Sequence, residues 1–400
     1  MQYRRFGKLD WKVSALGIGC MRLPTAAQTN GADILETEAA AMIRHAIDCG
    51  VNYVDTAYPY HGGESEKVLG RVLGNGYRAK VKLATKFPTW LAKTSSDFDH
   101  YFNEQLERLQ TGRIDFYLLH ALDAESWPRL RDLGFLPWAE KQRAAGRIGH
   151  LGFSFHDECQ VFKDIVDGYD DWTVGMIQYN YMDVENQAGR AGLEYAASKG
   201  LAVVVMEPLA GGRLTRPPAA VQALWDAAPN RRTSVEWALH WIWSQPEVSV
   251  VLSGMSTLQQ VVENLAAAGS SRPGLLTPSE LRTVEKVRAE YQRSCPVPCT
   301  ECGYCLPCPH GVNIPRNFRI FNDGAMYGDV TTSRGWYLNW LKEDARAGAC
   351  QECHDCEPRC PQHIPISEWM PRVRAVLADG QPYPTATKAG PCPQPNRTAD

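Results

Sequence analysis

The chain has 400 residues, which is more than one hydrophobic core usually spans, so we expect a large domain and a smaller one. Its 42 basic and 45 acidic side chains give a net charge of -3, which excludes the basic footprint of a nucleic-acid-binding protein. The apolar runs are too short to span a membrane, and the opening residues lack the apolar core of a signal peptide. We therefore expect a cytoplasmic protein, in which clustered cysteines bind metal more often than they form disulfides.

Short apolar runs of strand type alternate with helix-like segments along the first part of the chain. After a hairpin-like opening at 2–14, the runs lie at 15–20, 51–57, 81–87, 114–122, 150–155, 174–181, 201–208 and 248–255. Eight strands with intervening helices predict an α/β fold of the (β/α)8 or TIM-barrel type. A doubly wound sheet is the alternative, but no Gly-x-Gly-x-x-Gly turn follows the first run.

The composition changes near residue 290, where a region rich in proline and cysteine begins. We therefore expect a barrel domain over 1–290 and a small, cysteine-rich domain over 291–380. Within the small domain, 334–348 is predicted to be helical. The last residues, 381–400, are rich in proline and polar groups, and we expect them to lack fixed structure.

Four polar residues follow three neighbouring strands of the predicted barrel, at the end where such barrels keep their chemistry. Asp55 closes the second strand and Tyr60 follows in its loop. Lys86 closes the third strand, and His120 closes the fourth. Each alone would more often be a structural residue, but the four together at one predicted mouth favour a catalytic site.

These residue types suit the protonation of a carbonyl oxygen. A phenol with a pKa of about 10 is a weak acid at neutral pH. A nearby ammonium is expected to stabilise the phenolate and lower that pKa, while a carboxylate fixes the ammonium. The imidazole can orient the carbonyl toward the phenol while hydride arrives at carbon.

The pattern Asp-Thr-Ala-x-x-Tyr at 55–60, with Lys86 and His120, resembles the aldo-keto reductase family over roughly 1–290. The resemblance implies an NAD(P)-dependent oxidoreductase that reduces an aldehyde or ketone to an alcohol, or catalyses the reverse. Tyr60 would be the general acid/base, Lys86 and Asp55 would tune it, and His120 would orient the carbonyl. A small carbonyl or alcohol would be the substrate, with no nucleic-acid or membrane partner.

The resemblance also implies a set of cofactor-binding positions. Residues 208–212 are similar to the family's pyrophosphate loop, and 253–265 to its adenosine segment. The implied contacts are Ser154, Gln178, Met206, Leu209, Gly211, Gly254, Ser256, Glu263 and Asn264. Because 253–264 contains no Lys or Arg, and Arg213 and Arg216 lie in another loop, NADP and NAD both remain open.

Two groups of cysteines are similar, each a triplet at intervals of three plus a fourth cysteine followed by proline. Three residues precede the fourth cysteine in the second group, whereas only Leu306 and Pro307 precede it in the first. Zinc sites tend to use pairs of cysteines, whereas this spacing is that of two-cluster ferredoxins, in which the fourth cysteine binds the other group's cluster. The region 291–380 thus resembles a ferredoxin-like domain with two 4Fe-4S clusters. One cluster is assigned to Cys299, Cys302, Cys305 and Cys360, and the other to Cys350, Cys353, Cys356 and Cys308. Cys295 is the alternative to Cys308.

The role of the clusters has two interpretations. Nicotinamide transfers two electrons as hydride whereas a cluster takes one at a time, and no flavin-binding signature is visible to mediate between them. The clusters would therefore be structural or redox-sensing, or they would exchange electrons with a ferredoxin-like partner. The alternative function is a redox-sensing or electron-transfer protein whose barrel binds nicotinamide but is not primarily a carbonyl reductase. Trp90, Trp127 and Trp138 are candidates for the wall of the substrate pocket.

Overall fold

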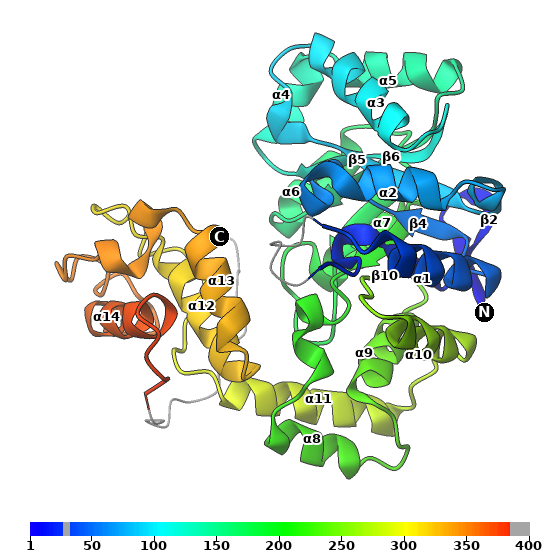
Figure 1. Ribbon diagram of the computed structural model, residues 1–400. Helices are drawn as coiled ribbons and strands as arrows, with labels where there is room; N and C mark the ends of the chain where they lie inside the picture. The colour runs from blue at the N-terminus through cyan, green and yellow to red at the C-terminus, as the bar shows by residue number, and fades with distance from the viewer. Residues whose placement is uncertain (27–32, 385–400) are drawn as a thin grey trace. The chain divides into compact units, whose positions relative to one another are not determined.

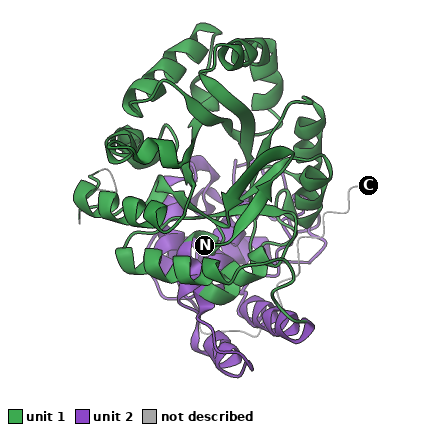
Figure 2. Ribbon diagram, turned by 90° about the vertical axis from the view of Figure 1, so that its right-hand side faces the viewer, with its two compact units in different colours: residues 1–211, 236–277 green, residues 212–235, 278–400 purple. Residues whose placement is uncertain are grey.

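The computed structural model describes residues 1–26 and 33–384. The contacts divide the chain into two compact units, residues 1–211 with 236–277 and residues 212–235 with 278–400 (Figure 2). Helix α11 (Pro278–Arg293) belongs to the second unit by its contacts. The domain boundary expected at residue 290 stays a prediction.

The first unit is a closed barrel of eight parallel strands, in the order β10-β3-β4-β5-β6-β7-β8-β9. This confirms the predicted TIM-barrel fold, and every predicted run coincides with one of its strands, except that β7 begins two residues before the run at 150–155. The strands are β3 (Leu16–Gly19), β4 (Tyr53–Asp55), β5 (Lys82–Phe87), β6 (Ile114–Leu122), β7 (Ile148–Phe155), β8 (Val174–Gln178), β9 (Ala202–Met206) and β10 (Val248–Ser253).

Helices that lie between the strands, and one that follows the last strand, cover the barrel (Figure 1). They are α1 (Glu36–Asp48), α2 (Glu64–Val72), α3 (Ser96–Arg108), α4 (Ser126–Asp132), α5 (Phe135–Ala144), α6 (Cys159–Asp167), α7 (Gly189–Ser198), α9 (Ser234–Trp243) and α10 (Leu258–Gly269). Helix α3 is an example, because Asp97 and Asp99 lie in its first turn and Arg108 in its last, as the helix dipole favours. None of the described helices is both long and apolar enough to cross a membrane.

The hairpin of β1 (Tyr3–Phe6) and β2 (Leu9–Ser14) covers the N-terminal end of the barrel. The backbone N–H of Lys8 donates to the carbonyl of Gly200, just before β9 begins, at 2.8 Å. The Phe6 ring lies 4.8 Å from the Phe116 ring and 5.7 Å from the Tyr53 ring, within the cluster that fills the barrel. The hairpin therefore leaves the opposite, C-terminal end for chemistry.

The second unit is helical and contains its own core. Its helices are α8 (Ala219–Asp226), α11, α12 (Ile314–Met326), α13 (Val330–Asn339) and α14 (Ile366–Leu377). The helix predicted over 334–348 is wrong beyond Asn339, where the chain turns into short 3-10 segments. Asn317 stabilises that turn, because its side chain donates to the carbonyl of Ala345 at 2.8 Å and accepts from the N–H of Ala347 at 2.7 Å.

The tail expected to be unstructured, 381–400, lies outside the described residues from residue 385 onward. The four residues before that point, 381–384, have no regular secondary structure.

We predict that Phe6→Ala lowers the free energy of unfolding of the barrel by about 3–5 kcal/mol, because Phe6 is fully buried and its removal leaves a cavity. Thermal unfolding followed by circular dichroism measures the change. Val262→Ala is the control, since Val262 is 44% exposed and its truncation should change the stability by at most about 0.5 kcal/mol. Equal effects of the two substitutions would contradict the conclusion that Phe6 is part of the packed core of the barrel.

Candidate active site

The C-terminal ends of three adjacent strands bring the four predicted catalytic side chains together. Asp55 ends β4, Lys86 lies next to last in β5, and His120 lies near the end of β6. Tyr60 begins the short 3-10 segment Tyr60–Gly63 that follows β4. The order and neighbourhood of these residues are those expected from the sequence.

The Lys86 ammonium is the centre of the site. Its Nζ lies 2.6 Å from Asp55 Oδ1, 2.8 Å from the carbonyl oxygen of Thr56 and 3.2 Å from the Tyr60 hydroxyl. Lys86 is only 1% exposed, so these three acceptors take the place of water around its three donors. A buried ammonium without them would be very costly, which makes the arrangement specific.

The surroundings of Lys86 and Tyr60 determine which of the two side chains is charged. Burial lowers the pKa of Lys86, but the nearby Asp55 and Tyr60 raise it by more, so the ammonium stays charged. Burial also raises the pKa of the Tyr60 phenol, and Lys86 lowers it by less. The expected effect of the ammonium on Tyr60 is present, but it is outweighed, and the phenol therefore keeps its proton at neutral pH.

His120 is held as a neutral imidazole. Burial, and then the positive charge of Lys86 and the neighbouring His156, place the pKa of His120 well below its usual value. Its ring lies 5.9 Å from the Tyr60 ring at 85°. Within residues 1–26 and 33–384, His120 Nδ1 is buried without a hydrogen-bond partner, so it is available to a substrate.

Of the three tryptophans considered for the pocket wall, Trp90 lies beside His120. The two rings are 5.1 Å apart, and Trp90 is 49% exposed. Trp127 packs against Trp172, with the ring centroids 5.7 Å apart. Trp138 of α5 packs against two phenylalanines of α3 and donates to Asp99, and both helices belong to the outer layer.

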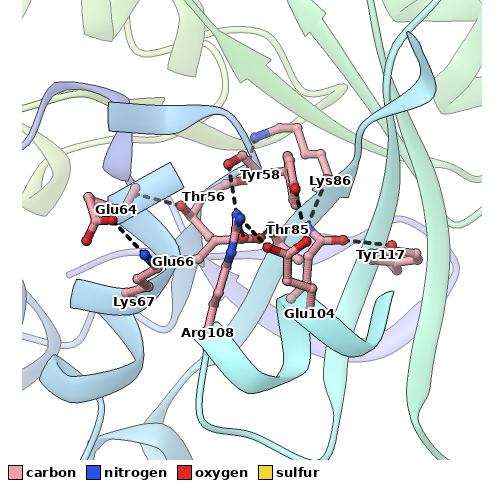
Figure 3. Close-up of polar contacts among 12 residues, drawn as sticks. Thr56, Tyr58, Glu64, Glu66, Lys67, Thr85, Lys86, Glu104, Arg108 and Tyr117 are labelled. Carbon is pink, nitrogen blue, oxygen red and sulfur yellow. Dashed lines mark hydrogen bonds and ion pairs between the residues drawn. The ribbon is translucent and has the colours of Figure 1, made fainter. Parts of the chain in front are cut away.

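A second buried charge lies behind Lys86, on the helix side of β5 (Figure 3). Glu66 of α2 is fully buried and accepts hydrogen bonds from Thr85 Oγ1 at 2.6 Å, Gln105 Nε2 at 2.7 Å and Arg108 Nη1 at 3.3 Å. Burial raises the pKa of Glu66, and these donors oppose that rise. The buried Glu66 carboxyl group thus accepts hydrogen bonds from three different side chains.

This network contacts the backbone of the two segments that carry Lys86 and Tyr60. Gln105 Nε2 donates to the carbonyl of Lys86 at 3.0 Å, and Arg108 Nη1 donates to the carbonyl of Tyr58 at 3.3 Å. Tyr58 lies two residues before Tyr60, so the network couples the turn that carries Tyr60 to the strand that carries Lys86. At Gly63 the turn has a φ of 95°, and a side chain there would be strained and would contact Arg108.

Two of the predicted nicotinamide contacts lie at the ends of β7 and β8. Ser154 Oγ accepts from the N–H of Ala121 at 2.8 Å. The Gln178 amide donates to Asp183 Oδ2 at 2.9 Å and accepts from Gln187 at 3.2 Å. The sequence analysis did not predict Asp183 and Gln187 as partners of Gln178, although both lie in the loop that follows β8.

The remaining cofactor positions follow β9 and β10. Met206 ends β9 and packs on the barrel cluster, and Leu209 and Gly211 lie in the turn after it. Gly254 and Ser256 follow β10, and Glu263 and Asn264 lie on α10. Glu263 is exposed and accepts from Gln259, whereas the Asn264 amide is buried and donates to Ser253 Oγ at 2.8 Å.

The two cysteine groups of the second unit form matching turns. The N–H of Glu301 donates to Cys299 Sγ at 3.4 Å, and the N–H of Glu352 donates to Cys350 Sγ at 3.5 Å. Both glutamates have a positive φ, 58° and 52°. The repeated spacing of the sequence is therefore a repeated backbone structure.

The predicted crosswise sets of cysteines fit the structure. One pocket is lined by Cys299, Cys302, Cys305 and Cys360, the four residues assigned to one cluster. In the other set, burial raises the pKa of Cys350, and the nearby Cys308 and Cys353 add to that rise. Cys308 is a free thiol and packs against the core cluster of the second unit together with Cys350 and Cys356, which fits its assignment as the fourth ligand.

The chemistry of these thiols suits iron clusters. Burial raises the pKa of Cys299 to about 12 and that of Cys305 to about 11, so metal binding must displace their protons. Across the described residues, no three His, Cys, Asp or Glu side chains lie close enough to hold one metal ion. The iron-sulfur assignment rests on the all-thiolate ligand set and on the ferredoxin-like spacing of the cysteines.

We predict that His120 makes the stability of the protein fall as the pH drops below about 6.5. The unfolded chain gains a proton on this histidine there, whereas the folded chain, with its lowered pKa, does not. Stability is therefore complete above that pH and is lost progressively below it. Urea unfolding at about pH 7.5 and about pH 5.5 measures the change, and the free energy of unfolding should fall less between these pH values for His120→Gln than for the wild type. His100→Gln, at an exposed position, is the control, and equal losses for all three proteins would contradict the prediction.

Comparisons with known proteins agree with this site. Residues 15–288 match the Aldo/keto reductase family, and residues 298–364 match the 4Fe-4S dicluster domain. L-galactose dehydrogenase of Arabidopsis thaliana is 30% identical over 289 residues, which cover 67% of this chain and 88% of that protein. The oxidoreductase YqkF of Bacillus subtilis is 27% identical over 316 residues, which cover 71% and 96%.

A solved structure shows the same fold. The holo form of aldo-keto reductase AKR11C1 from Bacillus halodurans superposes with a TM-score of 0.59 at 26% identity, over 72% of this chain and 96% of that one. The family match, the closed barrel and the residues at its C-terminal end agree. The chain belongs to the aldo-keto reductase family of oxidoreductases and carries a C-terminal domain for two 4Fe-4S clusters.

Proposed function

We propose that the barrel reduces the carbonyl group of a small aldehyde or ketone, or oxidises the matching alcohol, with a bound nicotinamide dinucleotide. The contact of Lys86 Nζ with both Asp55 Oδ1 and the Tyr60 hydroxyl carries this proposal. A barrel that only bound a nucleotide would not need a phenol and an ammonium buried in contact with each other.

The residues around the mouth fit a nicotinamide dinucleotide. Ser154 and Gln178 would hold the carboxamide, and the turn after β9 would lie against the diphosphate. Ala210 and Gly211 in that turn both have a positive φ, 47° and 69°, a backbone form whose N–H groups can gather around an anion. When bound, the nicotinamide supplies or accepts the hydride.

In this proposal, each side chain of the site has a different role in the reduction of the carbonyl group. Tyr60 holds a proton at neutral pH, because burial raises its pKa, and would donate it to the carbonyl oxygen. Lys86 would stabilise the phenolate that remains, and Asp55 keeps Lys86 charged. The neutral His120, with its free Nδ1, would orient the carbonyl oxygen toward Tyr60.

We predict that Tyr60→Phe lowers kcat/KM for aldehyde reduction by a factor of about 10² to 10⁴, because the proton donor is lost. Nucleotide binding, followed by tryptophan fluorescence, should be unchanged, since Tyr60 is not among the implied cofactor contacts. Tyr58→Phe is the matched control, because the Tyr58 hydroxyl donates to Glu104 on the helix side. Carbonyl reduction that survives in Tyr60→Phe would show that the catalytic assignment is wrong.

The clusters have a structural role in this proposal. Cys305 and Cys360 are 8% and 9% exposed and belong to the core cluster of the second unit, and four further cysteines pack against it. A small core of this kind commonly needs metal or disulfides to be stable. The second interpretation is that the clusters exchange electrons with a ferredoxin-like partner. The cytoplasmic location of the protein stays a prediction.

We predict that NADH or NADPH leaves the visible iron-sulfur bands of the anaerobically purified protein intact while an added aldehyde is reduced. Cys302→Ser should lower the iron content to about half and lower the unfolding temperature of the second unit. Cys49→Ser, at an exposed position on the barrel, should change neither. Bleaching of the bands by nicotinamide would instead show that the clusters are in electronic contact with the cofactor.

A further inference from the structure

Arg22 lies in the short 3-10 segment Cys20–Arg22 that follows β3. Contacts on both sides fix its backbone. The N–H of Leu23 donates to His61 Nε2, next to Tyr60 in the chain, at 3.2 Å. The carbonyl of Arg22 accepts from Ser256 Oγ, in the loop after β10, at 2.8 Å. The segment is thus anchored between the catalytic turn and the expected adenosine segment.

The Arg22 side chain extends across two of the predicted cofactor loops. A Cβ added to Gly254 would lie 3.4 Å from Arg22 Cβ and 3.5 Å from its Cδ, so the aliphatic stem packs directly on this glycine. A Cβ added to Gly211 would lie 3.5 Å from Arg22 Nη2. The stem therefore crosses the loop after β10, and the cation ends at the turn after β9.

The charge of Arg22 is not neutralised by the protein. Among residues 1–26 and 33–384, its guanidinium has no hydrogen-bond or ion-pair partner. Arg213, another cation near the end of β9 in the sequence, is paired with Asp323 at 2.6 Å within the second unit. Residues 253–264 contain no Lys or Arg at all. The guanidinium of Arg22 is thus a cation without a protein partner, beside a loop that is expected to bind phosphate.

We infer that Arg22 binds the diphosphate of the nicotinamide dinucleotide, an inference that rests on the proposed function. A guanidinium matches phosphate oxygens with two parallel hydrogen bonds. The diphosphate is favoured over a 2′-phosphate because the guanidinium lies at Gly211 rather than at α10, where the adenosine end is expected. NADH and NADPH share the diphosphate, so Arg22 should serve both equally.

The test is equilibrium titration of the holoprotein with NADPH and with NADH, followed by tryptophan fluorescence. Arg22→Met keeps a stem to pack on Gly254 but removes the charge. We expect Kd to rise by about 10- to 100-fold for both nucleotides, by similar factors. The salt dependence of binding should also weaken, and the unfolding temperature without nucleotide should not change. Arg5→Met, at an exposed position of the N-terminal hairpin, removes the same charge and should leave both Kd values unchanged.

Two outcomes would overturn the inference. A loss of affinity for NADPH alone would assign Arg22 to the 2′-phosphate, and unchanged affinity for both nucleotides would remove it from the cofactor site. Failure of the proposed function is distinguishable. If the wild type binds both nucleotides but reduces no carbonyl, that function is wrong, while the comparison of Kd values still decides the role of Arg22. If the wild type binds neither, both proposals are wrong.

Discussion

The buried ammonium of Lys86 is the constraint on which the site depends. A positive charge removed from water is stable only when well-placed acceptors replace the water, and removal of one partner leaves a costly uncompensated charge. Asp55, the Thr56 carbonyl and Tyr60 supply those acceptors. The loop after β4 must therefore keep its conformation for the charge to be tolerated, so the ammonium of Lys86 also fixes the position of Tyr60.

Strand β5 is held from both faces. Successive residues of a strand point to opposite sides, so Thr85 faces the helix layer while Lys86 faces the mouth. On the helix side, Thr85 contacts the buried carboxyl group of Glu66, which also accepts from Gln105 and Arg108. Two buried charged groups thus lie back to back across one strand, and movement of either would disturb the partners of the other.

The sequence predicted what depends on periodicity and spacing. The strand pattern located the barrel, and the order of strand ends located Asp55, Tyr60, Lys86 and His120 together. What it could not supply depends on burial, such as the net rise in the pKa of Tyr60, or on distant side chains, such as Asn317, which stabilises the turn after α13. Arg22, which also follows a strand end, was not predicted, because the reach of its side chain across Gly254 to Gly211 depends on how distant loops pack.

The cysteine groups show a different relation between sequence and structure. Equal spacing produces equal turns at Glu301 and Glu352, yet each predicted ligand set takes its fourth cysteine from the other group. The two groups therefore close long loops onto each other. Buried thiols with raised pKa values cannot ionise cheaply by themselves, so the metal must drive their deprotonation. Because Cys305 and Cys360 also belong to the core, the free energy of cluster binding would contribute to the folding of the second unit itself, as proposed above.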